Sequence, residues 1–162
     1  MLPDELKESP IPGALERWDS AAVLSGSAEL GEIVLRIAPN RIVDVCSFLR
    51  QQGKHVRLSG VTAVDRYPAE PRFDVVYLLH FISEGIRIRL KCSLPGTNPE
   101  IASVTSVWSG AAWYERETYD LFGVRFTGHP DLKRILMPDD WQGHPLRKDY
   151  PVHGHKYSYQ NE

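Results

Sequence analysis

Two acidic side chains lie one helical turn apart in the stretch WYERETYDLF, residues 113–122. At this spacing Glu117 and Asp120 could act as a general acid and base, or bind a hard metal ion such as Mg²⁺. No nucleophile, glycine-rich phosphate loop or HExxH motif accompanies them. We therefore expect their charges to pair with cations of the following segment or of a neighbouring protein, and Arg116 to pair with Asp120 one turn on.

Four of the six histidines fall between positions 129 and 155, where metal binding is the second chemistry to consider. His153 and His155 flank a single glycine and could hold a transition metal, but no cysteine or carboxylate stands at ligand spacing. His129 and His144 each precede a proline, which restricts them to extended backbone. We expect these two to serve as structural hydrogen-bond donors.

The bulk composition excludes several classes of protein. A formal net charge of −2 and a pI near 6.3 give no overall attraction to nucleic acid or anionic membranes. No apolar run approaches the roughly 20 residues that cross a bilayer, and the acidic N-terminus lacks a secretory signal. Cys46 and Cys92 are far apart and form no CxxC motif, which excludes an iron–sulfur cluster or cysteine zinc site on this chain. The chain is expected to be cytoplasmic.

The elements that position these side chains follow from hydrophobic periodicity. Apolar residues at helical spacing predict a helix from Pro39 to Gln52. Ser109 is expected to cap the charged helix, which spans about 111–122, and Gly123 to end it. The predicted strands span residues 33–37, 56–65, 73–82, 86–92 and 101–108. This order predicts an α+β fold, a mostly antiparallel sheet with helices on one face, followed by an extended proline-rich C-terminal arm.

By pattern the chain divides into three stretches. Residues 1–31 are a weakly patterned N-terminal segment, 32–123 form the α+β domain, and 124–162 form the arm. From Pro130 onward the arm has a proline every six to eight positions, which prevents long helices. Large apolar residues between the prolines need an anchor, so we predict that the arm docks on partner subunits. The cations expected to meet acidic groups across that interface are Arg125, Lys133, Arg134, Arg147 and Lys148.

The predicted strand 86–92 alternates apolar residues with Arg87, Arg89 and Lys91. Three cations in this pattern are typical of the solvated side of an antiparallel sheet. They also leave open an RNA-binding α+β module, although such modules need an exposed aromatic stacking platform that this chain lacks. A further alternative is a free-standing metal-dependent enzyme that uses Glu117, Asp120 and the histidines of the arm.

Three stretches near the C-terminus resemble a known family. Residues 115–123 read ERETYDLFG, residues 128–141 read GHPDLKRILMPDDW and residues 143–151 read GHPLRKDYP. Together they resemble the signature of the C subunit of proton-pumping NADH:quinone oxidoreductase (NADH-quinone oxidoreductase, respiratory complex I), the 30 kDa subunit family. The stretches VTAVD and SVTSVW further upstream are similar to that family too. The signature residues, which we expect at partner interfaces, are Glu115, Arg116, Glu117, Asp120, Phe122, Gly123, His129, Pro130, Arg134, Met137, Pro138, Trp141, His144, Pro145, Arg147, Lys148, Asp149 and Tyr150.

The resemblance implies a stand-alone structural subunit with no active site, metal or cofactor of its own. FMN and the iron–sulfur clusters of such a complex lie on other subunits, and electrons pass from NADH to quinone with coupled proton translocation. The implied partners are subunits D, B and I, in a hetero-oligomer without nucleic acid that links the chain to the membrane. The implied location is peripheral, at the cytoplasmic side of the bacterial inner membrane.

The same signature also fits the equivalent subunit of a related complex with another electron donor. Photosynthetic-type complexes, deazaflavin-linked dehydrogenases and membrane-bound hydrogenases contain such subunits, and the signature does not separate them. Neighbouring genes for NADH-binding flavoprotein subunits would favour NADH as the donor.

Overall fold

The chain folds around a five-stranded sheet with the strand order β1-β2-β5-β4-β3. The computed structural model of the protein describes residues 2–151. The strands are β1 (Val23–Glu29), β2 (Glu32–Ile37), β3 (Val56–Asp65), β4 (Phe73–Phe81) and β5 (Ile86–Leu94). Neighbouring strands run antiparallel except β2 and β5, which are parallel. This arrangement confirms the predicted α+β class with a mostly antiparallel sheet.

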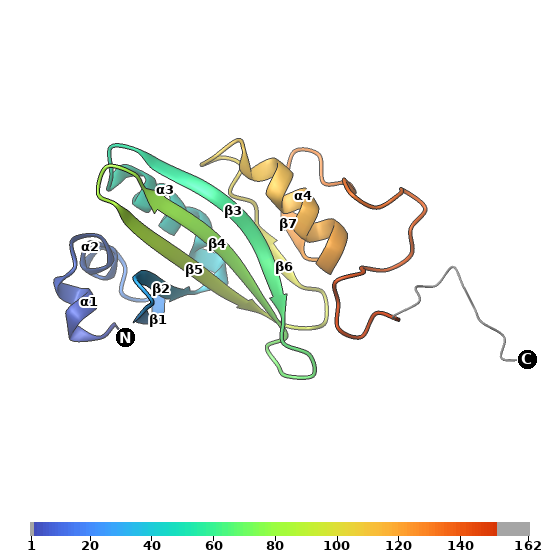
Figure 1. The fold of residues 1–162 in the computed structure, drawn as a ribbon, viewed down its shortest axis with the longest axis horizontal. Helices are drawn as coiled ribbons and strands as arrows, with labels where there is room; N and C mark the ends of the chain where they lie inside the picture. Colours follow the sequence, from blue (N-terminus) through green and yellow to red (C-terminus); the bar gives the residue numbers. More distant parts are fainter. Residues whose placement is uncertain (1, 152–162) are drawn as a thin grey trace, which may run out of the picture.

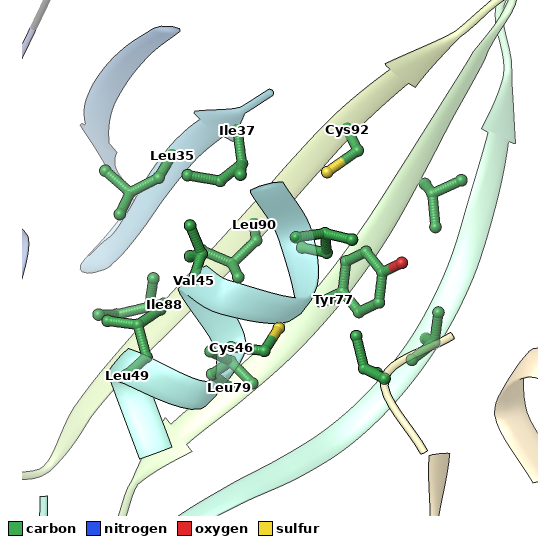
Figure 2. Packing of buried hydrophobic residues seen from close by; sticks show 14 of the residues in the cluster. Leu35, Ile37, Val45, Cys46, Leu49, Tyr77, Leu79, Ile88, Leu90 and Cys92 are labelled. Atoms are coloured by element: carbon green, nitrogen blue, oxygen red, sulfur yellow. The ribbon is translucent and has the colours of Figure 1, made fainter. Parts of the chain in front are cut away.

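One face of the sheet packs against α3 (Ile42–Gln51), which follows a short 3₁₀ turn, η1 (Pro39–Arg41). Figure 2 shows Val45, Cys46 and Leu49 of α3 beside sheet residues that include Tyr77 and Leu90. All five are fully buried, and each such apolar side chain contributes about 1.5–3 kcal/mol to folding. Cys46 therefore serves as a small hydrophobic residue, and burial raises the pKa of its thiol.

The N-terminal residues join the same core. Helices α1 (Asp4–Glu8) and α2 (Pro10–Trp18) bury Leu6 and Leu15, and β1 adds an edge strand. Sequence patterning shows little of this because β1 reads VLSGSAE, with small polar residues in place of alternating hydrophobic ones. Gly26 lies where Leu2 covers the sheet, and a Cβ there would stand 2.4 Å from Leu2 Cδ2. Packing of a distant residue, not periodicity, therefore decides this strand.

Helix α4 (Ala111–Phe122) covers the edge of β3 (Figure 1). The hydroxyl of Thr118 shares its proton between the carbonyl of Tyr114 at 2.8 Å and that of Val61 at 3.2 Å. The indole of Trp108 donates to the carbonyl of Val56 at 3.3 Å. Side chains thereby satisfy carbonyls of the strand that has no further strand beside it.

Two local predictions before α4 are wrong. The strand expected at 101–108 is only three residues long, β6 (Glu100–Ala102), and pairs in parallel with β7 (Arg125–Thr127). The next residues leave the strand because the amide of Val104 donates to the carboxylate of Glu115. Ser109 does not cap α4: the residue before the helix is Gly110, and no side chain caps it. None of the described helices is long and apolar enough to span a membrane.

Residues 128–151, called here the C-terminal segment, form turns and bends without helix or strand. In Figure 1 the segment begins after β7 beside the start of α4, loops outward past the helix and returns toward the end of β3. Strand β7 and the buried Phe126 precede it and belong to the packed core. Two groups of polar contacts fix the segment to the core, one at the end of α4 and one at the ends of β3 and β4.

Candidate functional site

The last three carbonyls of α4 accept hydrogen bonds from the C-terminal segment in sequence order. Asp120 O accepts from His144 Nδ1 at 2.9 Å, Leu121 O from the amide of Leu146 at 3.0 Å, and Phe122 O from Arg147 Nε at 2.6 Å. A helix leaves its final carbonyls without partners inside the helix. Residues more than twenty positions further along the chain supply them here.

Gly123 makes this close passage possible. Its φ of +74° ends α4 in the left-handed conformation, as expected from the sequence. A Cβ at this position would stand 2.5 Å from both Arg147 Nη2 and His144 Cδ2, so any side chain would push the segment away. Both the backbone conformation and the available space therefore require glycine.

The side chain of Asp120 is fully buried and lies at the centre of these contacts. Its Oδ2 accepts hydrogen bonds from the consecutive amides of Ile135, Leu136 and Met137 at 2.8–3.0 Å. Its Oδ1 accepts from Arg134 Nη1 at 2.6 Å. We call Asp120, Arg134, His144 and Arg147 the helix-end junction.

Burial alone would raise the pKa of Asp120, but the amide and guanidinium donors outweigh it and hold the pKa below its usual range. Arg134 reaches further and donates through Nη2 to the carbonyls of Trp141 and Gly143. The ion pair of Arg134 with Asp120 thus holds the backbone at both ends of the loop between 134 and 143. An ionised carboxylate with four donors already bound is suited to fixing the backbone and not to exchanging protons with a substrate.

The predicted pairing of Arg116 with Asp120 is wrong. Arg116 donates instead to the carbonyls of Lys133 and Arg134, at 3.1 and 2.8 Å. Glu117 is exposed, whereas Asp120 is buried, so the two carboxylates do not face a common site. The acid–base pair suggested by their spacing is not assembled.

A second group of charges ties the end of the segment to the sheet. Arg72 donates to both carboxylate oxygens of Asp65, at 2.9 and 2.8 Å, and to both of Asp149, at 2.9 and 2.6 Å. The amide of Lys148 adds a bond to Asp65 Oδ2 at 2.8 Å. We call Asp65, Arg72 and Asp149 the strand-end cluster. The donors to Asp65 outweigh the effect of its burial and lower its pKa, and the two carboxylates raise the pKa of Arg72.

Phe73 joins the two groups. The guanidinium carbon of Arg72 lies 5.0 Å from the centre of its ring and that of Arg147 lies 5.2 Å away. Both distances fit cation–π contacts. No site role was predicted from the sequence for Asp65, Arg72 or Phe73, although an acid that ends one apolar strand and an arginine that precedes the next were visible signals.

A different carboxylate lies near the start of α4. Glu115 is fully buried and accepts hydrogen bonds from Ser103 Oγ at 2.6 Å and from the amide of Val104 at 2.8 Å. No cation bonds to it among residues 2–151. Burial raises its pKa to about 7, and the two hydrogen bonds offset only part of that effect.

Comparison with known proteins identifies the family. Residues 35–156 match the family described as "Respiratory-chain NADH dehydrogenase, 30 Kd subunit". The chain belongs to this family. It is 48% identical over 136 residues to the C subunit of NADH-quinone oxidoreductase from Geobacter sulfurreducens, covering 83% of this chain and 84% of that one. It is 46% identical over 146 residues to the protein of the same name from Roseiflexus castenholzii, covering 87% and 84%.

Solved structures share the fold. A structure of the trypsin-resistant fragment of Nqo5, residues 1–134, is similar with a TM-score of 0.64 at 29% identity, covering 74% of this chain and 97% of that fragment. A chain of the membrane-bound sulfane sulfur reductase, an archaeal respiratory membrane complex, is similar with a TM-score of 0.75. At 23% identity, over 90% of this chain and 86% of that one, the second likeness shows the fold alone.

The signature residues of this member of the 30 kDa family fall into three groups. One group binds the backbone or other side chains within the chain, as described for the two polar groups and for Glu115. His129 belongs with them, since its Nε2 lies 3.1 Å from the carbonyl of Ala112 and its Nδ1 accepts from the amide of Asp131. His129 and His144 are thus hydrogen-bonded within the chain, as expected. His153 and His155 lie outside the described residues.

The second group contributes backbone atoms or partial packing. Met137 donates its amide to Asp120, Trp141 gives its carbonyl to Arg134, and Tyr150 donates its hydroxyl to the carbonyl of Gln142. Phe122 is buried in the core. Pro138 gives its carbonyl to the amide of Trp141 at 3.0 Å. The third group is exposed or half-buried with no such role: Glu117, Pro130 and Pro145.

Three cations of the predicted arm have acidic partners within the chain. Arg125 pairs with Glu100 and Lys133 with Asp131, in addition to the pair of Arg134 with Asp120. That these three cations also meet acidic groups across an interface stays a prediction.

Large apolar side chains of α4 and of the C-terminal segment are exposed instead. They are Trp113 of α4 at 61%, Leu136 at 60% and Leu146 at 51%. Among residues 2–151 there is no cluster of three or more His, Cys, Asp or Glu that could hold a metal ion. The surface around the junction therefore offers apolar anchors and not metal ligands.

Proposed function

We propose that this chain is a structural subunit of the peripheral arm of a proton-pumping NADH:quinone oxidoreductase. Its family and its relatives, which are C subunits of such oxidoreductases, support this assignment. In this proposal the chain holds no cofactor, FMN and iron–sulfur clusters lie on other subunits, and the chain docks on subunits D, B and I at the cytoplasmic side of the membrane.

The observation that carries the proposal is the rigid presentation of exposed apolar side chains. The helix-end junction fixes the backbone at 135–137, from which Leu136 projects at 60% exposure, and the carbonyl of Leu121 fixes the amide of Leu146. Fixing an exposed leucine costs conformational entropy, and contact with water provides no hydrophobic burial to offset that cost. Burial in a protein–protein interface does offset the cost, because aliphatic side chains on a backbone that is already fixed bind without a further loss of backbone entropy.

The chemistry of the carboxylates supports a structural role. Asp120 and Asp65 already accept hydrogen bonds from several donors of the same chain. They are therefore poorly placed to bind a substrate or a metal ion. Glu117 is exposed and has no assembled partner group for acid–base catalysis.

The test is purification of the native complex from the membranes of cells that express tagged variants of the full-length chain, with the amount of co-purified complex as the measurement. Leu136→Ser and Leu146→Ser should lower the amount of co-purified complex, because each removes an exposed anchor without touching the core. Leu24→Ser is the matched control, since Leu24 is 55% exposed on β1, far from α4 in the sheet order. Equal recovery of the complex with all three variants would contradict the proposal that the C-terminal segment docks on partner subunits.

A second measurement separates structure from catalysis. Glu117→Gln should change quinone-reductase activity only in proportion to the amount of assembled complex. Normal assembly with lost turnover would instead make Glu117 a catalytic residue and overturn the structural proposal.

A further inference from the structure

The sheet face opposite α3 is basic, in contrast to the chain as a whole. In Figure 1, α3 lies on one side of β3, β4 and β5, and α4 covers the β3 edge. On β5 the residues Ile88, Leu90 and Cys92 point toward α3 (Figure 2). The residues between them, Arg89 and Lys91, therefore point to the opposite face.

Strand register lines the cations up across the sheet. Arg57 of β3 is opposite His80 of β4, and His80 is opposite Arg87 of β5, so these three side chains form one row. Two rows further along, Lys91 of β5 is opposite Arg36 of β2. We call Arg36, Arg57, His80, Arg87, Arg89 and Lys91 the basic face.

Two carboxylates on this face are engaged in ion pairs. Glu32 pairs with Arg89, and Asp74 pairs with both Arg36 and Arg66. Among the side chains that the structure describes, Arg57, Arg87 and Lys91 have no ion pair. A chain with a formal net charge of −2 thus carries an uncompensated positive surface in one place.

The basic face is also hollowed. A depression of about 270 Å³ is lined by Arg57, His80, Arg87 and Arg89, together with one carboxylate, Glu32, which pairs with Arg89. Arg89 Nε is buried and lacks an acceptor among the described residues. An unpaired buried donor is costly, so Arg89 gains by turning its guanidinium toward an added acceptor.

We propose that the basic face binds an acidic segment of a partner protein in the complex, with carboxylates at alternate positions of an extended chain. Arg87, Arg89 and Lys91 are two residues apart, so their Cα atoms repeat roughly every 6–7 Å along β5. Alternate side chains of an extended segment have the same spacing. The inference rests on the proposed subunit role and adds a second docking surface to the C-terminal segment.

The surface fits an acidic protein better than a nucleic acid. Single-stranded nucleic acids are bound by cationic grooves that also offer aromatic rings for base stacking. The exposed large aromatic side chains of the described chain, Trp18, Tyr67 and Trp113, lie on α2, in a loop and on α4, away from the basic face.

Lys91 allows a direct test in the assembled complex, because it is the one lysine of the basic face. A zero-length carbodiimide reagent joins a lysine amine to a carboxylate in contact with it. We expect Lys91 to be joined to an Asp or Glu of another subunit and Lys91→Arg to abolish that product while keeping the charge. The proposal is overturned if Lys91 in the purified complex is joined to no other subunit and is acetylated as readily as Lys7 of α1.

Charge reversal gives the quantitative test. The combined change Arg57→Glu, Arg87→Glu and Lys91→Glu should lower recovery of the partner by about tenfold or more at physiological salt. Lys7→Glu, which reverses a cation on α1, is the matched control and should leave recovery unchanged. Equal loss with both, recovery equal to wild type with the triple variant, or preferential binding of a labelled single-stranded RNA oligonucleotide by the purified chain would overturn the proposal.

The two proposals fail in different ways. Should the wild-type chain co-purify with no other subunit, the structural role itself fails. Should the complex assemble normally while the triple variant behaves as wild type, only the basic-face inference fails.

Discussion

The two buried carboxylates of α4 lie five positions apart, and their pKa values are shifted in opposite directions. Glu115, near the start of the helix, meets only neutral donors, Ser103 Oγ and the Val104 amide, and burial raises its pKa to about 7. Asp120, near the end, meets Arg134 and three amides of the C-terminal segment, and its pKa is lowered. Both side chains are fully buried, so the partners decide the charge state.

This difference teaches where the helix relies on the rest of the chain. At Glu115 the packing tolerates a neutral side chain, and ionisation is a cost. At Asp120 the negative charge is required, since without it a buried guanidinium and three amides lose their acceptor. The end of α4 that contacts the C-terminal segment is therefore the end at which charge stabilises the fold.

Loss of the Asp120 carboxylate should have the largest effect. Asp120→Ala leaves Arg134 without its counter-ion and should cost about 4 kcal/mol in free energy of unfolding, measured by chemical denaturation. The difference from wild type should shrink as pH falls through the lowered pKa of Asp120, because the protonated side chain no longer pairs. Glu117→Gln on the exposed side of the same helix is the control, and an equal loss there would contradict the central role of Asp120.

Neutralising Glu115 should have the opposite sign. The pKa of Glu115 rises on folding from 4.5 to about 7, so the folded state binds the proton more tightly and its contribution to stability is lost as pH rises through that window. Glu115→Gln removes this loss, and above pH 7 the variant should gain up to about 3 kcal/mol relative to wild type, compared with pH 4. A wild-type-minus-variant difference that does not change with pH would show that Glu115 ionises normally.

Removing one hydrogen-bond donor to Glu115 should widen the difference between the pKa values of Glu115 and Asp120, with a smaller effect on stability than the two changes above. Ser103→Ala deletes the hydroxyl that favours the ionised form, so the pKa of Glu115 should move further up, and neutral-pH stability should fall by about 1 kcal/mol. Infrared titration of the carboxyl stretch follows this pKa directly. Thr105→Ala removes the neighbouring hydroxyl, which bonds Ser103 and not Glu115, and serves as the control.

The strand-end cluster should show the smallest effect. Asp149 is 42% exposed in its side chain, so Asp149→Asn should cost only about 0.5 kcal/mol, because solvent screens the pair and Arg72 keeps its bond to Asp65. Thermal unfolding at low and high salt measures this. A cost as large as that of Asp120→Ala would mean that both groups of polar contacts anchor the segment equally.

The regular part of the fold was predictable from the sequence because burial of one sheet face imposes alternation. Strands β3, β4 and β5 and helix α3 lie within a few residues of their predicted bounds. Strand β1 was not predictable, because the glycine at position 26 is required by the close packing of Leu2 and Leu35, which belong to other parts of the fold. Local pattern carries no information about such distant contacts.

For the candidate site, residue identity was predictable but partnership was not. The signature named both Asp120 and Arg134, yet helical spacing favoured Arg116 as the partner of Asp120. The actual partner is 14 positions away in an irregular segment. Periodicity relates residues only within one element, so a carboxylate at a helix end gives no sign of which distant donor it will meet.

The glycine that ends α4 has a consequence for synthesis of the chain. The last three carbonyls of the helix receive their donors from 144, 146 and 147, which leave the ribosome after the rest of the domain. A nascent chain that ends before position 144 already holds Arg134 for Asp120, but it leaves the carbonyls of Leu121 and Phe122 without their donors. Translation thus finishes the helix end last, and a chain that stops early exposes this unfinished end to cellular quality control before any partner is met.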